Sequence, residues 1–185
     1  MHNRKILIIG EVYVDQHLDI IENGYSTSRL GGIFHAARSC DALNIEYALA
    51  YYAPDYLVKD VEKFGIDVLR ASSIFRLGKV DKAPNVMLIG QSDESGNQLY
   101  ENILGRQAEY VSMLPFMQVL DDFDPTDIII FPGRYGNAGI LSNLSNYEGK
   151  IHIDMNYDCD DILDLDTIKT VSYTHLRAHE TRRHL

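Results

Sequence analysis

Short apolar runs recur along this 185-residue chain and alternate with helical or mixed polar segments. Four of these segments predict strands, at 6–9, 45–52, 127–131 and 150–154. The first is apolar on both faces, as in a buried parallel sheet, and 127–131 is also typical of a buried strand. The alanine-rich stretch 33–43 and residues 55–64 predict helices, the second capped by Asp55 and closed at Gly65. Alternating buried strands and helices predict an α/β fold with a parallel sheet covered on both faces.

Two further regions predict a small accessory sheet. Residues 86–90 and 98–103 resemble strands and flank a glycine-containing turn, which is typical of a β-hairpin. The polar segment 12–30 suits a loop or a short exposed hairpin, and residues 137–147 suit a short helix. The tyrosine pair at 51–52 is interpreted as core or interface rather than as part of a cofactor site.

Charge narrows the classes of partner. The 17 lysines and arginines stand against 27 aspartates and glutamates, a net charge of -10, which argues against nucleic acid and anionic membrane surfaces as partners. No apolar run is long enough to span a bilayer, and the first is too short for a signal peptide. Cys40 and Cys159 lack metal-ligand or redox spacing. We therefore expect a cytoplasmic protein.

The end of the chain differs from the rest. Six aspartates lie between 154 and 166, but a Ca²⁺ loop counted from Asp158 would place Leu163 where glycine is required, so we interpret the run as a solvated loop. Residues 171–185 are instead basic and rich in histidine, and they resemble translated sequencing-adapter read-through. We interpret them as a non-native or disordered tail after a domain formed by residues 1–170.

Candidate ligand contacts follow from the predicted sheet. In α/β sheets, ligands bind beyond the carboxyl ends of the strands, which here selects residues 10–15, 132–136 and 154–158. Gly31 and Gly32 open the predicted helix 33–43, where backbone can approach a ligand closely.

The order of these motifs resembles the N-terminal part of ribokinase/PfkB-family carbohydrate kinases. The resemblance runs from residue 5 to about 165 and rests on Gly10-x4-Asp15, Gly31-Gly32-Ile33-Phe34-His35, Asn44–Leu49, Lys59–Asp67, Asp93–Asn97 and His152–Asn156. It implies a three-layer α/β/α ribokinase-like fold with a small β lid, at about 12–30 and 84–103. It also implies ATP- and Mg²⁺-dependent phosphorylation of a sugar or sugar-phosphate hydroxyl, and a homodimer formed through the lid.

The resemblance assigns roles to individual residues. Asp15 would bind sugar hydroxyls, Gly31 and Gly32 would let the sugar lie against backbone, and His35 would contact a hydroxyl or a phosphate. Arg134, after a predicted strand, suits a substrate phosphate or a solvated loop. The last two candidates orient Mg²⁺ or phosphate, or else serve turn chemistry: Asp154 and Asn156.

Two departures from the family pattern bear on activity. His35 stands where the family has asparagine, and the family's Gly-Ala-Gly-Asp and Asn-x-x-Glu elements do not occur. We therefore expect no catalytic residue in this chain. The catalytic aspartate and the ATP site would lie beyond its end, in a longer parent, and the chain alone would be inactive.

Two alternatives belong to other functional classes. One is a non-catalytic sugar- or nucleotide-binding module on the same scaffold, motivated by His35 and by the missing catalytic element. The other is a dinucleotide-binding Rossmann protein. Residues 10–12 lack the Gly-x-Gly-x-x-Gly spacing that brings a pyrophosphate to a helix N-terminus, so we rank it last.

Overall fold

A seven-stranded sheet forms the centre of the protein in the computed structural model, which describes residues 4–17, 27–92, 98–103, 108–131, 140, 143–144, 147–155 and 174–178. The strands lie in the order β11-β10-β9-β1-β4-β5-β8, and all neighbours are parallel except β5 and β8. They are β1 (Lys5–Glu11), β4 (Glu46–Ala53), β5 (Ser73–Asp81), β8 (Glu109–Ser112), β9 (Asp127–Ile130), β10 (Lys150–Met155) and β11 (Thr174–Ala178).

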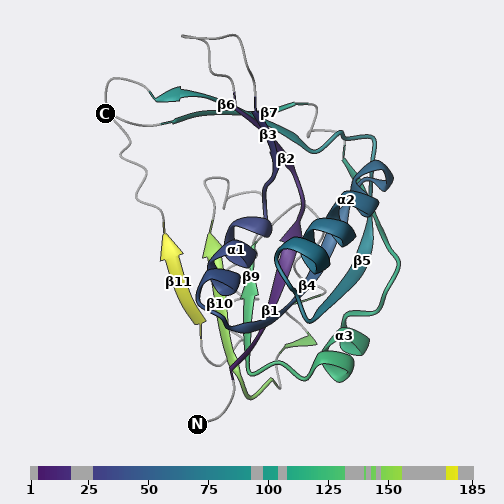
Figure 1. Ribbon diagram of the computed structural model, residues 1–185. Helices are drawn as coiled ribbons and strands as arrows, with labels where there is room; N and C mark the ends of the chain where they lie inside the picture. The colour runs from purple at the N-terminus through teal and green to yellow at the C-terminus, as the bar shows by residue number, and fades with distance from the viewer. Residues whose placement is uncertain are drawn as a thin grey trace.

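A second sheet, called the lid sheet below, lies across the end of the main sheet to which β1, β9 and β10 point (Figure 1). It has the order β3-β2-β6-β7, with antiparallel pairs β2–β3 and β6–β7 and a parallel pair β2–β6. The hairpin predicted at 86–103 is therefore confirmed, and of the two alternatives for 12–30, a loop or a hairpin, the structure shows the hairpin. The lid strands are β2 (Val14–His17), β3 (Thr27–Leu30), β6 (Val86–Ser92) and β7 (Gln98–Ile103).

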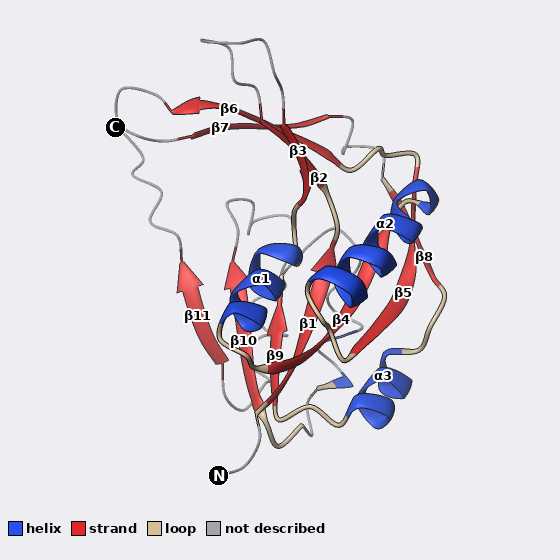
Figure 2. Cartoon of the chain, viewed as in Figure 1, coloured by secondary structure: helices blue, strands red, loops and turns tan. Residues whose placement is uncertain are grey.

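Apolar side chains on both faces of the main sheet explain why it is buried. Along β1, Ile6 and Ile8 point into one core, and Leu7 and Ile9 point into the other. The first core is closed by α1 (Phe34–Ala42) and α2 (Val58–Lys63), which lie in front of the sheet in Figure 2. The second core contains residues of α3 (Phe116–Phe123). The protein thus has the three layers that the sequence predicts.

The helical segment after β4 differs from its prediction at both ends. It begins with a 3₁₀ turn (Asp55–Leu57), and Asp55 makes no capping hydrogen bond but pairs with Arg76 at 2.5 Å and Lys79 at 2.8 Å. It continues past Lys63 in a π-helical turn (Phe64–Val68). Gly65 therefore does not end the helix. A side chain there would overlap Ile74 of β5, so this glycine allows the helix to pack closely on the sheet.

Three elements escaped the sequence analysis: β5, β8 and α3. Charges conceal β5, because Arg76 and Lys79 interrupt its apolar pattern and are matched by Asp55 only in the folded chain. In α3 the apolar stripe is short, and it buries Phe116, Val119 and Phe123 against the sheet. The tyrosine pair at 51–52 is buried, as predicted.

Two further predictions, the tail at 171–185 and the helix at 137–147, can be compared with the structure only in part. Residues 174–178 of the tail form β11, parallel to β10, so this part of the tail is a strand; that the tail is non-native stays a prediction. Most of the predicted helix 137–147 lies outside the described residues. Among the described residues, no helix is long and apolar enough to cross a membrane.

Two leucines provide a matched test of the core. Leu49 in β4 is fully buried, whereas Leu43 after α1 is 70% exposed. We expect Leu49→Ala to lower the free energy of unfolding by about 2–5 kcal/mol, because it removes apolar contacts and leaves a cavity. Leu43→Ala should change it by less than about 0.5 kcal/mol. Urea titration followed by circular dichroism measures both, and equal losses would contradict this assignment of the core.

Candidate functional site

The chain changes direction in the main sheet between β1 and β9. From β1 it proceeds outward through β4 and β5, and it then returns to build β9, β10 and β11 on the other side. Open α/β sheets bind ligands outside the carboxyl ends of the strands at such a switch point. β1 ends there at Glu11 and passes through two residues directly into lid strand β2. The candidate site therefore lies between the main sheet and the lid sheet.

Asp15 is the acidic centre of this region. It lies in β2, opposite Arg29 of β3, and only 4% of its surface is exposed. Its Oδ2 atom is 3.0 Å from His35 Nε2 and 3.6 Å from Arg29 Nε. Both partner side chains are about half exposed. A buried carboxylate acceptor is thus bordered by donors that a ligand can reach.

The two glycines bring backbone against this carboxylate. A side chain at Gly31 would overlap the carboxylate of Asp15, and one at Gly32 would overlap the carbonyl oxygen of Glu11. Gly32 also has φ +61°, a left-handed conformation that glycine adopts without strain. Hydrogen bonds fix the approach, since Gly31 N–H donates to Tyr13 O at 2.8 Å. Four predicted site residues therefore lie together: Asp15, Gly31, Gly32 and His35.

Arg38 adds a second arginine beside Arg29. Its Nη2 donates to Leu30 O at 2.7 Å, while Nη1 is buried and has no hydrogen-bond partner among the described residues. Burial lowers the pKa of Arg38, as does the charge of Arg29, and the charge of Asp15 opposes both. Two guanidinium groups and an imidazole thus surround one carboxylate. The two guanidinium groups favour an anionic group on a ligand.

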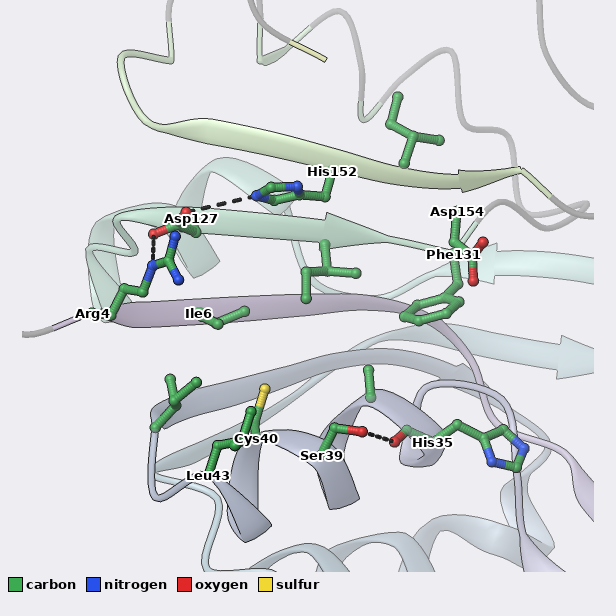
Figure 3. Close-up of a pocket in the computed structure, with 14 residues that line it drawn as sticks. Arg4, Ile6, His35, Ser39, Cys40, Leu43, Asp127, Phe131, His152 and Asp154 are labelled. Atoms are coloured by element: carbon green, nitrogen blue, oxygen red, sulfur yellow. Dashed lines mark hydrogen bonds and ion pairs between the residues drawn. The ribbon is translucent and has the colours of Figure 1, made fainter. Parts of the chain in front are cut away.

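A groove of about 720 Å³ runs from this region down the main sheet, between α1 and strands β1, β9 and β10. Asp154 and His35 lie at one end of it (Figure 3). Asp127 lies at the other end, with Oδ2 3.4 Å from Arg4 Nε and Oδ1 3.7 Å from His152 Nε2. Cys40 also lines the groove, and burial raises the pKa of its thiol. The floor is otherwise largely apolar.

The other predicted site residues are placed apart or not placed. Asp154, the next-to-last residue of β10, lies on the groove, across from His35 rather than beside Asp15. Arg134 and Asn156 lie outside the described residues. Sequence reasoning missed Arg29 and Arg38, because only the β2–β3 register and the turn into α1 bring them to Asp15.

The chemistry of the site is recognition of polar groups. Asp15 can accept hydrogen bonds from hydroxyls, and Arg29 and His35 can donate to oxygen atoms. Among the described residues, no group of three or more histidine, cysteine, aspartate or glutamate side chains is arranged to hold a metal ion.

Solved structures with the same architecture include several kinases, although the sequence matches no protein-family model and no curated protein. Ribokinase from Giardia lamblia matches with TM-score 0.66 and 16% identity, over 91% of this chain and 56% of that one. A nucleoside kinase of the ribokinase family from Methanocaldococcus jannaschii matches with TM-score 0.57 and 13% identity, over 94% and 60%. An uncharacterised sugar kinase from Pyrococcus horikoshii, solved with ATP, matches with TM-score 0.51 and 15% identity, over 90% and 58%.

These similarities establish the fold. The protein has the α/β ribokinase-like fold with a separate small sheet, as the sequence predicts. It spans little more than half the length of the kinases that it matches.

The contact between Gly31 and Asp15 can be tested by a double-mutant cycle. Gly31→Ala should lower the free energy of unfolding by about 1–3 kcal/mol, because the new methyl group overlaps the carboxylate of Asp15. In an Asp15→Ala background the same change should cost at least about 1 kcal/mol less, because the obstructing atoms are gone. Urea titration of the four proteins measures this coupling. Additive losses would show that the two residues do not meet.

Proposed function

We propose that this chain is the sugar-binding part of a PfkB-type carbohydrate kinase. Its full-length parent would transfer the γ-phosphoryl group of ATP to a hydroxyl of a sugar or sugar phosphate. The observation that carries the proposal is the buried Asp15, held against Gly31 between the lid sheet and the switch point of the main sheet. Kinases that share this fold make a sugar the first ligand to test.

The site suits a polyhydroxylated ligand. Asp15 has two oxygen atoms that accept hydrogen bonds, and a charged acceptor binds hydroxyls more strongly than a neutral one. Gly31 leaves backbone bare beside the carboxylate, so a flat sugar ring can lie against it. His35 is half exposed and already points a ring nitrogen at Asp15, from where it can reach the same ligand.

The surrounding charge favours a phosphorylated sugar within this class. Two guanidinium groups, those of Arg29 and Arg38, lie near the carboxylate of Asp15. Arginine binds phosphate through two parallel hydrogen bonds, and an exposed guanidinium such as that of Arg29 is free to rotate toward a ligand. Arg134 is a further proposed phosphate contact.

ATP and Mg²⁺ belong to the parent protein in this proposal. The described residues do not form a metal site, so no step of the reaction is assigned to them. The ATP-bound sugar kinase from Pyrococcus horikoshii supports the choice of nucleotide. Asp154 and Asn156 remain proposed orienting groups for Mg²⁺ or phosphate. For Asp154 the support is its place near the carboxyl end of β10, at the edge of the sheet where ligands bind. A homodimer through the lid is likewise a proposal, for which β3 and β7 offer strand edges.

Sugar binding tests the first half of the proposal. Calorimetric titration with ribose, fructose and their phosphates should show binding, tighter for the phosphorylated forms. Asp15→Asn should weaken it about 10- to 100-fold, since each hydrogen bond to a charged group contributes about 1.5–3 kcal/mol. Asp55→Asn is the matched control, because Asp55 is an exposed, ion-paired aspartate that lies outside the site, and affinity should stay unchanged. Equal effects of the two variants would refute the site.

Phosphoryl transfer separates the kinase from the alternative, a non-catalytic binding module. The gene read beyond codon 170 should encode a Gly-x-Gly-Asp element, and its full-length product should phosphorylate the bound sugar at the expense of ATP. The 185-residue chain should not. A full-length product that binds sugar but consumes no ATP would favour the binding module.

A further inference from the structure

A buried carboxylate outside the sugar contacts links the two sheets. Glu11 ends β1, and only 5% of its surface is exposed. Its Oε2 atom accepts hydrogen bonds from Tyr13 Oη at 2.9 Å and Asn85 Nδ2 at 3.2 Å, and its Oε1 accepts from Tyr110 Oη at 2.9 Å. The donors lie on three separate segments: the connection to β2, the residue before β6, and β8.

The backbone of the same residue supports the glycine pair. The carbonyl oxygen of Glu11 accepts from Ile33 N–H at 3.2 Å and occupies the space that a side chain at Gly32 would need. The position of Glu11 therefore determines where α1 begins. The backbone of Glu11 contacts the di-glycine. Its side chain accepts hydrogen bonds from Tyr13 and Asn85, just before β2 and β6, which form the base of the lid sheet.

Asn85 transmits this contact to β2. The side-chain amide of Asn85 donates not only to Glu11 but also to Val12 O at 3.1 Å. The backbone carbonyl oxygen of Asn85 accepts from Val14 N–H at 2.8 Å. Asn85 has φ +50°, a left-handed conformation that is uncommon outside glycine and better tolerated by asparagine than by most residues. Val14 directly precedes Asp15. The contacts of Glu11 thus reach the acidic centre of the site through Asn85 and Val14.

Burying the side chain of Glu11 costs free energy of folding unless hydrogen bonds compensate it. Burying a carboxylate requires compensating hydrogen bonds, and the three donors named here are all neutral. Glutamine has nearly the same shape and would not carry a charge, but it has one acceptor oxygen where glutamate has two. A carboxylate is the side chain that accepts from all three segments at once.

We propose that Glu11 is the positioning residue that fixes the lid sheet over the di-glycine, so that Asp15 faces Gly31. Its use in sugar binding rests on the proposed function, whereas its hold on the lid does not. The substitution Glu11→Gln replaces one of the two acceptor oxygens with an amide nitrogen that only donates, so at least one of the three donors loses its acceptor. It should release the base of the lid while the apolar core of the main sheet stays intact.

Hydrogen–deuterium exchange of the 185-residue chain measures this directly. Glu11→Gln should speed exchange about tenfold in β2, β3 and β6, as expected for the loss of one or two buried hydrogen bonds. Exchange in β4 and β9 should stay within about twofold of the wild type. Glu62→Gln makes the same chemical change on the exposed face of α2 and should alter neither region. Tyr110→Phe removes one donor only and should give a smaller increase at the lid, which keeps the test available if Glu11→Gln does not fold.

Two exchange results would overturn the proposal. Unchanged exchange in the lid strands would show that Glu11 does not hold them. Equal acceleration in the lid and in β4 and β9 would show a role in global stability alone.

Sugar titration of the same variants separates this inference from the proposed function. If the wild type binds ribose 5-phosphate or fructose 6-phosphate, Glu11→Gln should weaken binding about tenfold although Glu11 makes no sugar contact. Unchanged affinity with a loosened lid would refute positioning. If the wild type binds none of the sugars, the proposed function fails, and lid exchange still decides whether Glu11 holds the lid.

Discussion

The candidate site depends on one close contact of the backbone. Residues 31–32 lie directly against the end of β1 and the start of β2. Gly31 lies against the carboxylate of Asp15, and Gly32 lies against the carbonyl oxygen of Glu11. Any side chain at either position would force the lid strand away from α1. This contact brings Asp15, the start of α1 and the two sheets together. The groove between α1 and β9 begins next to them, at His35.

The two acids at this junction have different surroundings and different proposed roles. Asp15 is bordered by Arg29 and His35, which are half exposed and free to exchange one acceptor for another. Glu11 is enclosed by two phenols and an amide whose positions are fixed by three segments of chain. Half-exposed partners suit a group that binds a ligand, whereas hydrogen bonds from three separate segments suit a group that holds structure. The surroundings of the two acids, rather than residue type, separate their proposed roles.

Most of the strands and helices that the local sequence pattern predicts are present in the structure. The predictions fail where contacts between separate segments decide the local structure. β1, β4 and β9 consist mostly of apolar residues, and such runs are buried whatever their neighbours. In β10 the buried residues Ile151 and Ile153 alternate with polar ones. β5 was missed because its charges are neutralised only when Asp55 lies beside it. Gly65, predicted to end a helix, instead allows one to pack on β5. In each case the deciding partner is remote in sequence.

By itself the sequence determined the α/β class, a parallel sheet covered on both faces and the hairpin at 86–103, because periodicity and turn residues are local properties of the chain. Asp15 and the two glycines became candidates for one site through the resemblance of their motifs to a kinase family. Only the tertiary structure decided that Arg29 and His35 share Asp15, and that Glu11 meets Asn85 and Tyr110, which lie 74 and 99 residues away. Local pattern indicates that a side chain is buried. Which polar groups compensate that burial depends on strand order and register, and these are fixed only when the sheets assemble.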